Sequence, residues 1–278
     1  MREGLADAGF VDGRNVRIEY RSAEGHYDQL PALAAGLVRV PVAVLVATGI
    51  TAALAAKKAT ATIPVVFHTG GDPVKAGLVA SLNRPGGNVT GIVTLGKMLV
   101  PKQFELVHEL VPKADPIGFL VNPKNGALQS DISDARAASR TKGVQLRIVE
   151  AADDRDLETA FAALAQRQIG ALIVQPDPFL DGRHDRIAAL AARHSVPMIA
   201  AYPQFAAAGG LITYGNSLAA AHRLEGIYAG RLLKGEKPAD MPVQQSVSVK
   251  LVINLKTAKA LGLMVPPSLL ARADEVIE

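Results

Sequence analysis

Small polar residues follow most of the apolar runs in this sequence, where predicted strands end and helices begin. Helix N-termini offer free backbone N–H groups and a positive dipole end, which suit carboxylates and other anions. An Asp can pair with an ammonium group, and aromatic rings can close over an apolar body. The candidate ligand-binding residues are Thr48, Gly49, Thr69, Gly70, Gly71, Asp72, Asn122, Asn125, Asp177, Phe179, Tyr202 and Tyr214.

Each candidate also has a purely structural interpretation. Asp72 precedes Pro73, as an N-cap precedes a proline at the first helical position. Asn122 and Asn125 could simply cap a helix, and tyrosines often pack half-buried. Asp177 lies between two prolines at a position where a cleft is expected, so ligand contact is favoured there.

Catalytic and metal-binding motifs are missing from the sequence. "GGDPV" is not followed by Gly-Lys-Ser/Thr, and no G-x-S-x-G or H-E-x-x-H occurs. Ser217 and His222 have no acid placed by the sequence to complete a triad. The six histidines are not spaced as ligands, so we interpret them as structural or surface residues: His26, His68, His108, His184, His194 and His222. We expect no enzyme activity, no cofactor and no metal.

Composition narrows the class of protein further. The 278 residues contain 49% hydrophobic and only 4% aromatic residues, so an aliphatic core is expected. The net charge of +4 is spread along the chain, which argues against a nucleic-acid partner. There is no cysteine, so disulfides and thiol catalysis are excluded. No apolar run approaches the ~18 residues of a membrane span, and no signal peptide is visible.

Strands and helices are expected to alternate along the whole chain. The length of the chain suggests two domains, and the alternation of strands and helices starts again after residue 97. The predicted strands are 15–20, 42–47, 64–68, 88–94, 116–121, 145–150, 171–175, 197–201, 209–213 and one within 247–254. The predicted helices are 27–39, 51–60, a short one after Asp72, 99–111, 127–141, 154–167, 181–194 and two later ones.

The chain opens on "REGLADAGF", which looks like the second half of a helix. The strand that should precede it is absent, and in doubly wound sheets the first strand usually lies in the middle of the order. We therefore hypothesise that an upstream strand and an export signal precede this sequence in the native product.

Several stretches together resemble the ABC transporter substrate-binding protein family, which includes tryptophan- and tyrosine-type binding proteins. They are "EGHYDQLPALAAGLV", "SLNRPGGNVTGI", "LVHELVP", "VNPKN", "GGLITYG", "YAGRLLKGEKPADMPVQ" and "LVINLKTAKALGL". The resemblance runs from about residue 1 to 278. One loop differs: "QPDPF" keeps Asp177 but has Pro178 where the pattern "PTDN" has Asn.

The resemblance implies an α/β fold of two doubly wound, Rossmann-like lobes joined by a hinge, as in type I periplasmic binding proteins. Lobe 1 would comprise 1–95 and about 214–245, and lobe 2 would comprise 96–213 and about 246–278. The implied function is a monomeric solute-binding component of an ABC importer. It would trap a small polar or carboxylate-bearing ligand by hinge closure, outside the cytoplasm, beside a permease and an ATPase.

Two other functions stay open at this point. The same fold could sense a ligand for a signalling partner, or a two-lobe α/β enzyme could convert the ligand. The ligand itself is open among amino acids, aromatic acids and related metabolites.

Overall fold

The computed structural model describes residues 1–94, 96–246 and 249–278. The chain divides into two compact units, each made of two chain segments. Unit 1 comprises Met1–Thr94 and Leu218–Val247, and unit 2 comprises Leu95–Ser217 and Ser248–Glu278. Within the described residues, no helix is long and apolar enough to cross a membrane.

Unit 1 is built on a parallel four-stranded sheet with the order β1-β2-β3-β9. All five residues of β2 are buried, because helices cover both faces of this strand. The strands are β1 (Leu45–Thr48), β2 (Val65–Thr69), β3 (Val89–Thr94) and β9 (Gln244–Ser246). The helices are α1 (Arg2–Asp7), η1 (Tyr27–Gln29), α2 (Leu30–Val38), α3 (Ile50–Ala59), α10 (Leu218–Leu233) and η2 (Pro238–Asp240).

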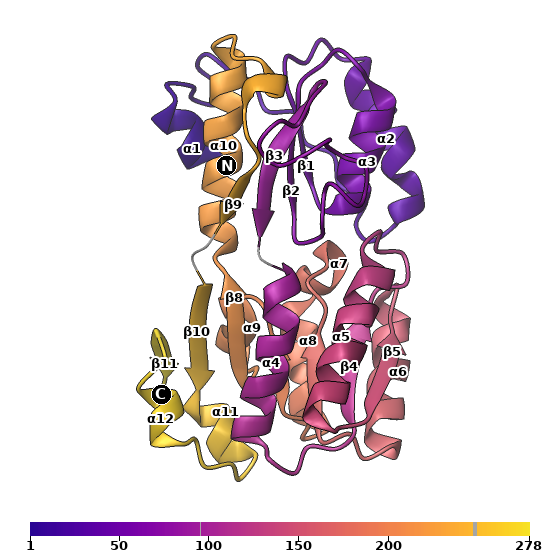
Figure 1. Ribbon diagram of the computed structural model, residues 1–278, viewed down its shortest axis with the longest axis vertical. Helices are drawn as coiled ribbons and strands as arrows, with labels where there is room; N and C mark the ends of the chain where they lie inside the picture. The colour runs from indigo at the N-terminus through magenta and orange to yellow at the C-terminus, as the bar shows by residue number, and fades with distance from the viewer. Residues whose placement is uncertain (95, 247–248) are drawn as a thin grey trace. The chain divides into compact units, whose positions relative to one another are not determined.

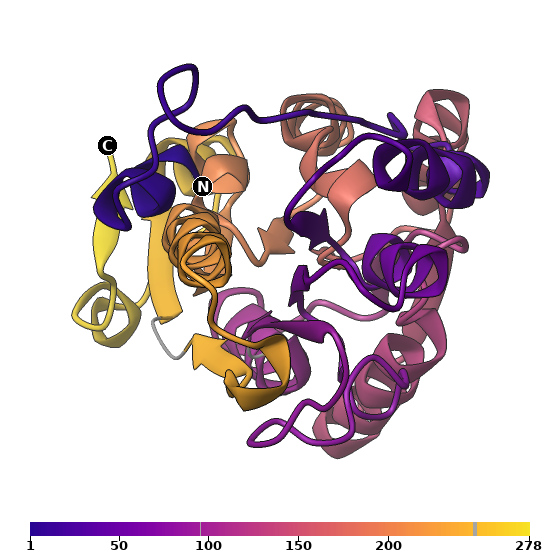
Figure 2. The ribbon, with the colours of Figure 1, turned by 90° about the horizontal axis from the view of Figure 1, so that it is seen from above.

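Helices α3 and α10 pack on opposite faces of this sheet, as Figures 1 and 2 show. Successive residues of a strand point to opposite faces. Val66 packs with Tyr228 and Leu232 of α10, so His68, two residues further along β2, also points toward α10.

Helix α1 lies against α10 (Figure 1), and glycines permit the close approach. A Cβ on Gly226 would lie 2.1 Å from the Met1 carbonyl oxygen, and one on Gly4 would overlap the Arg223 carbonyl group. The two backbones therefore touch where larger residues would hold them apart.

Unit 2 contains a seven-stranded sheet with the order β11-β10-β8-β7-β6-β4-β5. Only the β10–β8 pair is antiparallel among the described pairings. The strands are β4 (Ile117–Val121), β5 (Leu146–Glu150), β6 (Ala171–Val174), β7 (Met198–Ala200), β8 (Ile212–Asn216), β10 (Val249–Asn254) and β11 (Glu275–Ile277).

Aliphatic side chains and a few phenylalanines form a core between α4 and this sheet. Phe104 and Val107 of α4 pack on Phe119 and Ile173 of the central strands. The helices are α4 (Gly96–Leu110), α5 (Leu128–Lys142), α6 (Asp154–Gln166), α7 (Pro178–Asp181), α8 (His184–Arg193), α9 (Pro203–Ala207), α11 (Leu255–Ala260) and α12 (Pro267–Leu270).

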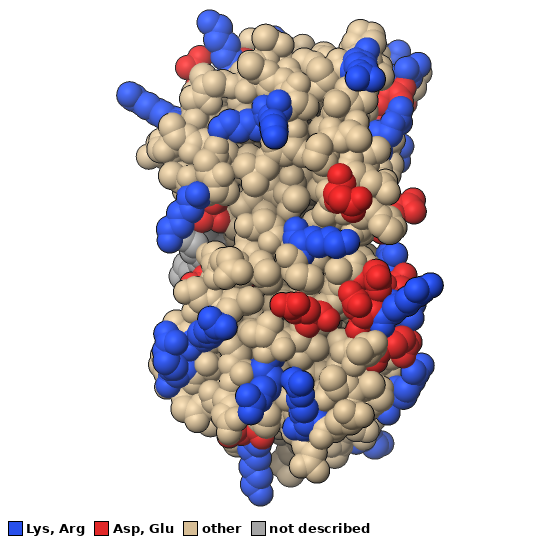
Figure 3. Space-filling model, turned by 90° about the vertical axis from the view of Figure 1, so that its right-hand side faces the viewer, with Lys and Arg blue, Asp and Glu red and all other residues tan. Residues whose placement is uncertain are grey.

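Charged residues of α6 and α8 pair at the surface of unit 2. Arg183 approaches Asp154 to 3.0 Å, and Arg186 and Arg193 each approach Glu158 to 3.3 Å. The face shown in Figure 3 carries acidic and basic side chains next to one another, with Lys and Arg otherwise scattered. Such exposed pairs contribute little stability, a median of about 0–1 kcal/mol each.

Most predicted strands and helices are confirmed within a few residues, and the mixed α/β class with parallel sheets is confirmed. The strand predicted at 15–20 is wrong. Only an isolated bridge between Asp12 and Val16 forms there. Alternation alone does not make a strand without a paired neighbour, and Arg17 and Arg21 instead form ion pairs with Glu19.

Candidate functional site

Three of the predicted residues in unit 2 meet in one hydrogen-bonded cluster. Asn122 follows β4, and Asp177 follows β6, its neighbour in the sheet. Asn122 Nδ2 donates to Asp177 Oδ1 over 3.1 Å, and Asn125 Nδ2 donates to Asp177 Oδ2 over 2.8 Å. Asn122 and Asp177 are fully buried. The carboxylate therefore ties together the loops after two neighbouring strands.

The same carboxylate caps a helix. Asp177 Oδ1 accepts from the backbone N–H groups of Phe179 and Leu180, at the start of α7. Asn122 Oδ1 accepts from Lys124 N, and Asn125 Oδ1 accepts from Ala127 N. The structural interpretation of these residues is thus confirmed, and the caps hold the loops in a defined shape.

Two further carboxyl groups lie close to Asp177. Gln175 links one of them to the cluster, since it accepts from Asn122 N and donates to Asp131 Oδ2 over 2.6 Å. Burial raises the pKa of Asp131 to about 6, although the hydrogen bond from Gln175 opposes the rise. Burial, and then the charge of Asp177, raise the pKa of Asp181 well above its usual value. Burial and the neighbouring carboxylate thus favour the protonated form of Asp181.

The aromatic candidates differ in their surroundings. Phe179 is buried, and the Arg183 guanidinium lies 5.4 Å from its ring centre. Tyr202 is buried at the N-cap of α9, which follows β7. Tyr214 was expected after a strand that ends at residue 213, but β8 continues to Asn216. Tyr214 therefore lies within the sheet, paired with Leu251, because strand length depends on the neighbouring β10.

In unit 1, Thr69 is the last residue of β2, and side chains of β2 and β3 hold the loop of Gly70 to Asp72 that follows it. Thr69 Oγ1 accepts from Gly71 N over 3.0 Å, and Thr94 Oγ1 donates to the Thr69 carbonyl over 3.4 Å. A Cβ on Gly70 would lie 3.5 Å from Thr94 Oγ1. The loop therefore packs closely against the end of β3.

The short helix predicted after Asp72 is wrong. Asp72 Oδ1 accepts from Val74 N and Lys75 N in the manner of an N-cap, and Ala76 N donates to the Asp72 carbonyl. The chain then leaves the helical path, and Gly77 adopts a φ of +72°. A left-handed glycine ends a helical turn, so the segment remains a capped turn.

Thr48 and Gly49 join β1 to α3. Gly49 has a φ of +90°, which a residue with a side chain rarely adopts, and precedes the first turn of α3. The Thr48 side chain is exposed, and its Oγ1 donates to Glu225 Oε1 over 3.3 Å. The end of β1 is thereby connected to α10.

The structure also brings together residues that the sequence analysis set aside. His68 of β2 and His222 and Glu225 of α10 place one potential ligand atom each within 4.8 Å of one another. The spacing of the histidines along the chain did not indicate this group, and the expectation of no metal stays a prediction. The i,i+3 spacing of His222 and Glu225 was visible, since it puts both on one helix face, but their proximity to His68 was not.

His68 is buried, and burial lowers its pKa to about 4, against the raising effect of Glu225. The ring is therefore neutral at pH 7. Its Nδ1 lies 3.5 Å from Glu225 Oε1 without forming a hydrogen bond, so this approach is not a charged pair. His222 Nδ1 and Glu225 Oε2, by contrast, form a hydrogen bond of 2.8 Å.

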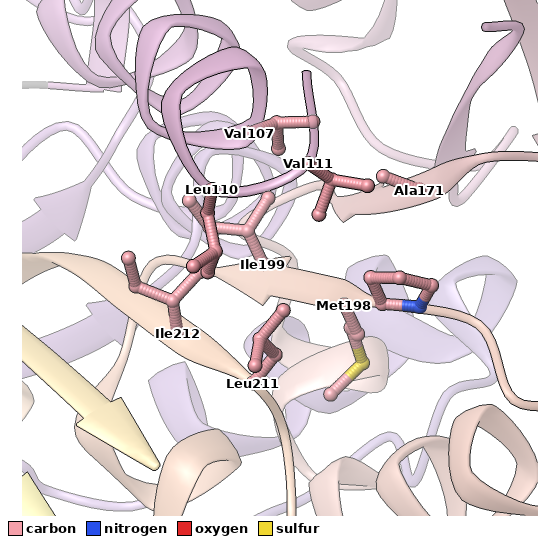
Figure 4. A pocket seen from close by; sticks show the side chains of 9 residues that line it. Val107, Leu110, Val111, Ala171, Met198, Ile199, Leu211 and Ile212 are labelled. Carbon is pink, nitrogen blue, oxygen red and sulfur yellow. The ribbon is translucent and has the colours of Figure 1, made fainter. Parts of the chain in front are cut away.

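A small apolar cavity lies at the amino ends of the strands of the unit 2 sheet, under α4 (Figure 4). Its lining includes Val107, Leu110, Met198 and Ile212. Met198 and Ile212 are the first residues of β7 and β8, so the cavity is remote from the carboxyl ends of these strands. Its aliphatic lining offers no polar partner for a ligand.

A family model described as "ABC transporter substrate binding protein" matches residues 1–277. The chain belongs to this family. The resemblance inferred from the sequence is thus confirmed, and the family is one of binding proteins for small ligands.

Individual relatives of this substrate-binding protein agree with that assignment. A tyrosine-binding protein from Clostridioides difficile (strain R20291) is 29% identical over 264 residues, which cover 94% of this chain and 75% of the relative. A conserved domain protein from Vibrio cholerae has 27% identity and a TM-score of 0.90. An ABC domain from Streptococcus pneumoniae in complex with L-Trp has 26% identity and a TM-score of 0.89. Both structural alignments cover 99% of this chain and 92% of the other.

More distant structures share the fold alone. One is an ABC transporter periplasmic solute-binding protein from Actinobacillus succinogenes with bound D-allose, at 15% identity and a TM-score of 0.61. The fold is that of type I periplasmic binding proteins. In such α/β folds, ligands bind outside the carboxyl ends of the strands, which is where the loops of Thr69 and Asp177 lie.

Proposed function

We propose that this chain is the solute-binding component of an ABC importer. It acts outside the cytoplasm as a monomer, beside a membrane permease and an ATPase. It catalyses no reaction. It traps a small polar or carboxylate-bearing ligand between its two lobes by hinge closure, and it releases the same molecule unchanged.

The Asp177 cluster is the observation that carries this proposal. A buried carboxylate that accepts from Asn122, Asn125 and the first turn of α7 holds two loops at the carboxyl edge of the unit 2 sheet. Such fixed polar loops favour binding, because little conformational entropy is lost when a ligand arrives. The sequence offers no matching catalytic arrangement beside them.

Unit 1 supplies the second set of contacts in this proposal. Backbone N–H groups of the Thr69–Asp72 loop and the exposed hydroxyl of Thr48 would meet the ligand's carboxylate or another polar group. Asp72 holds the turn behind the loop through Val74 N and Lys75 N. Phe179, Tyr202 and Tyr214 would provide apolar surface on the side of unit 2.

We propose an amino acid or a related small acid as the ligand. The tyrosine-binding relative and the L-Trp complex support this class. The carboxyl groups of Asp131 and Asp177 would favour an ammonium group. Pro178, which replaces the Asn of the "PTDN" pattern, removes one side-chain amide and thus favours a ligand with fewer polar groups at that position.

Closure follows from differential affinity. A ligand that contacts both lobes stabilises the closed arrangement by the free energy of the contacts that exist only there. Ligand contacts with one lobe alone would shift no equilibrium, so residues of both units must contribute.

A thermal-shift screen against amino acids, aromatic acids, sugars and nucleobases tests the proposal. A ligand present at a hundred times its Kd stabilises the folded chain by about 2.7 kcal/mol. We expect hits in one chemical class, recovered unchanged after incubation, and a smaller radius of gyration in solution scattering when the hit is added. Conversion of the hit would identify an enzyme, and an unchanged radius would contradict hinge closure.

A further inference from the structure

The cluster of His68, His222 and Glu225 in unit 1 has the donor atoms of a metal site. His68 lies near the carboxyl end of β2, and the other two residues lie in the first turns of α10. Two imidazoles and one carboxylate form a set that binds zinc in known proteins and can also bind other divalent transition metals. The three ligand atoms lie within 4.8 Å of one another.

His68 is a buried polar side chain without a hydrogen-bond partner among the described residues. Its side chain is 4% exposed, and neither ring nitrogen has a hydrogen-bond partner within the described part of the chain. A buried polar group without a hydrogen-bond partner destabilises a folded protein. The hydrogen bond between His222 and Glu225 accounts for those two residues, but it leaves His68 unexplained.

We propose that these three side chains bind one divalent transition metal ion, with zinc as the best fit. Zinc bonds of about 2.0–2.1 Å in a tetrahedron place neighbouring ligand atoms roughly 3.3–3.4 Å apart. His68 Nδ1 lies 3.5 Å from Glu225 Oε1, and His222 Nδ1 lies 2.8 Å from the other carboxylate oxygen, Oε2. The three ligand atoms lie within 4.8 Å of one another, so the side chains would rotate to bring one atom of each into coordination.

The surroundings of the cluster support this assignment. Thr48 Oγ1 donates to Glu225 Oε1. In metal sites, hydrogen bonds from residues that surround the ligands orient those ligands in the same way. The Glu225 side chain is 2% exposed, whereas that of His222 is 39% exposed. An ion and a fourth, water ligand can enter from the side of His222. The ion would join β2 to α10, which belong to different segments of unit 1.

Zinc titration of the full chain, without an affinity tag and stripped with a chelator, tests the site. We expect calorimetry to find one Zn²⁺ per chain, and a melting temperature that rises with Zn²⁺ but not with Mg²⁺ or Ca²⁺. Co²⁺ should bind competitively and show the visible absorption of a site with nitrogen ligands. Absence of binding by the native chain, or stronger binding of Ca²⁺ than of Zn²⁺, would overturn the proposal.

Single substitutions test which side chains bind the Zn²⁺ ion. His222→Gln, His68→Gln and Glu225→Gln should each weaken Zn²⁺ binding by about 100-fold or more, beyond the 10- to 100-fold seen for outer-shell changes. His222 is half-exposed, so its variant should fold even if the other two do not. His26→Gln and His108→Gln remove exposed histidines of unit 1 and unit 2 and should leave binding unchanged.

The opposite pattern would refute the assignment. If His222→Gln binds Zn²⁺ as the native chain does, or if His26→Gln or His108→Gln abolishes binding, the ion lies elsewhere. This test does not depend on the solute ligand, since Zn²⁺ alone is the probe. It therefore stands or fails separately from the proposed importer function.

Discussion

Asn125 donates its side-chain amide to Asp177 Oδ2 over 2.8 Å, although the two residues belong to loops that follow different strands. Asp177 Oδ1 meanwhile accepts from Asn122 and from the first turn of α7. One buried carboxylate thus sets the shape of two loops at once. Charge-assisted bonds of this kind are stronger than neutral ones, so the chain should be sensitive to a neutral isostere at this position.

We expect Asp177→Asn to lower the free energy of unfolding by about 1.5–3 kcal/mol, measured by urea denaturation. An amide has one acceptor oxygen, and its NH₂ group would face the NH₂ group of Asn125 or Asn122. Asp153→Asn is the matched control, because Asp153 caps α6 through the same pattern of backbone N–H groups. Asp and Asn cap helices about equally well, so the control should not change stability measurably.

Ligand affinity should depend on the same cluster. Asn125→Ala removes the bonds to Asp177 and to Ala127 N, which frees the loop after β4. We expect a loss of about tenfold or more in affinity for the hit of the thermal screen, measured by calorimetry. Asn88→Ala deletes an amide that bonds Thr60 and Ile63 at the amino end of β3. If the control loses as much affinity as Asn125→Ala, the loop is not part of the binding site.

Asp131 should make stability depend on pH. Its pKa is raised to about 6 from 3.8, so between these values the folded chain binds more protons than the unfolded chain. The free energy of unfolding therefore falls as pH rises through this window, and the loss persists above it. Asp134, Asp177 and Gln175 are the groups that act on this carboxyl.

Asp131→Asn should remove this slope, because an amide does not titrate. The amide oxygen can still accept from Gln175, so the hydrogen bond is kept. Relative to the native chain, the variant should gain stability from pH 4 to 6, by at most about 1.4 kcal/mol for each pH unit. Urea denaturation at several pH values measures the difference. Asp185→Asn, which removes an exposed carboxylate of the same unit, controls for the loss of charge. A constant difference between native chain and Asp131→Asn would contradict the prediction.

The contact between α1 and α10 should tolerate no side chain at Gly226. A Cβ there would lie 2.1 Å from the Met1 carbonyl and 2.7 Å from Leu5 N. We expect Gly226→Ala to destabilise the chain by about 1–3 kcal/mol, as overpacking does. Gly36→Ala in α2, where a Cβ would meet nothing within 4 Å, should instead stabilise by about 0.5–1 kcal/mol. Thermal unfolding of both variants distinguishes packing from helix propensity.

The amino-acid sequence by itself indicated most of the strands and helices, and the family, but not β9, α12 or β11. Buried strands such as β2 and β4 appear as continuous apolar runs because both of their faces are covered. Turn residues mark their ends, so the loops at the carboxyl edge, including those of Thr69 and Asp177, were predictable. The motifs that carry the family resemblance are local stretches and need no tertiary structure.

Only the tertiary structure decided which of these residues meet. The alternating pattern at 15–20 predicted a strand, but no described strand pairs with it, and pairing is what makes a strand. Tyr214 lies inside β8 because β10, from the end of the chain, extends the pairing to Asn216. His68 meets His222 and Glu225 because α10 returns to pack on the sheet of unit 1. Such contacts join residues far apart along the chain, and local periodicity carries no information about them.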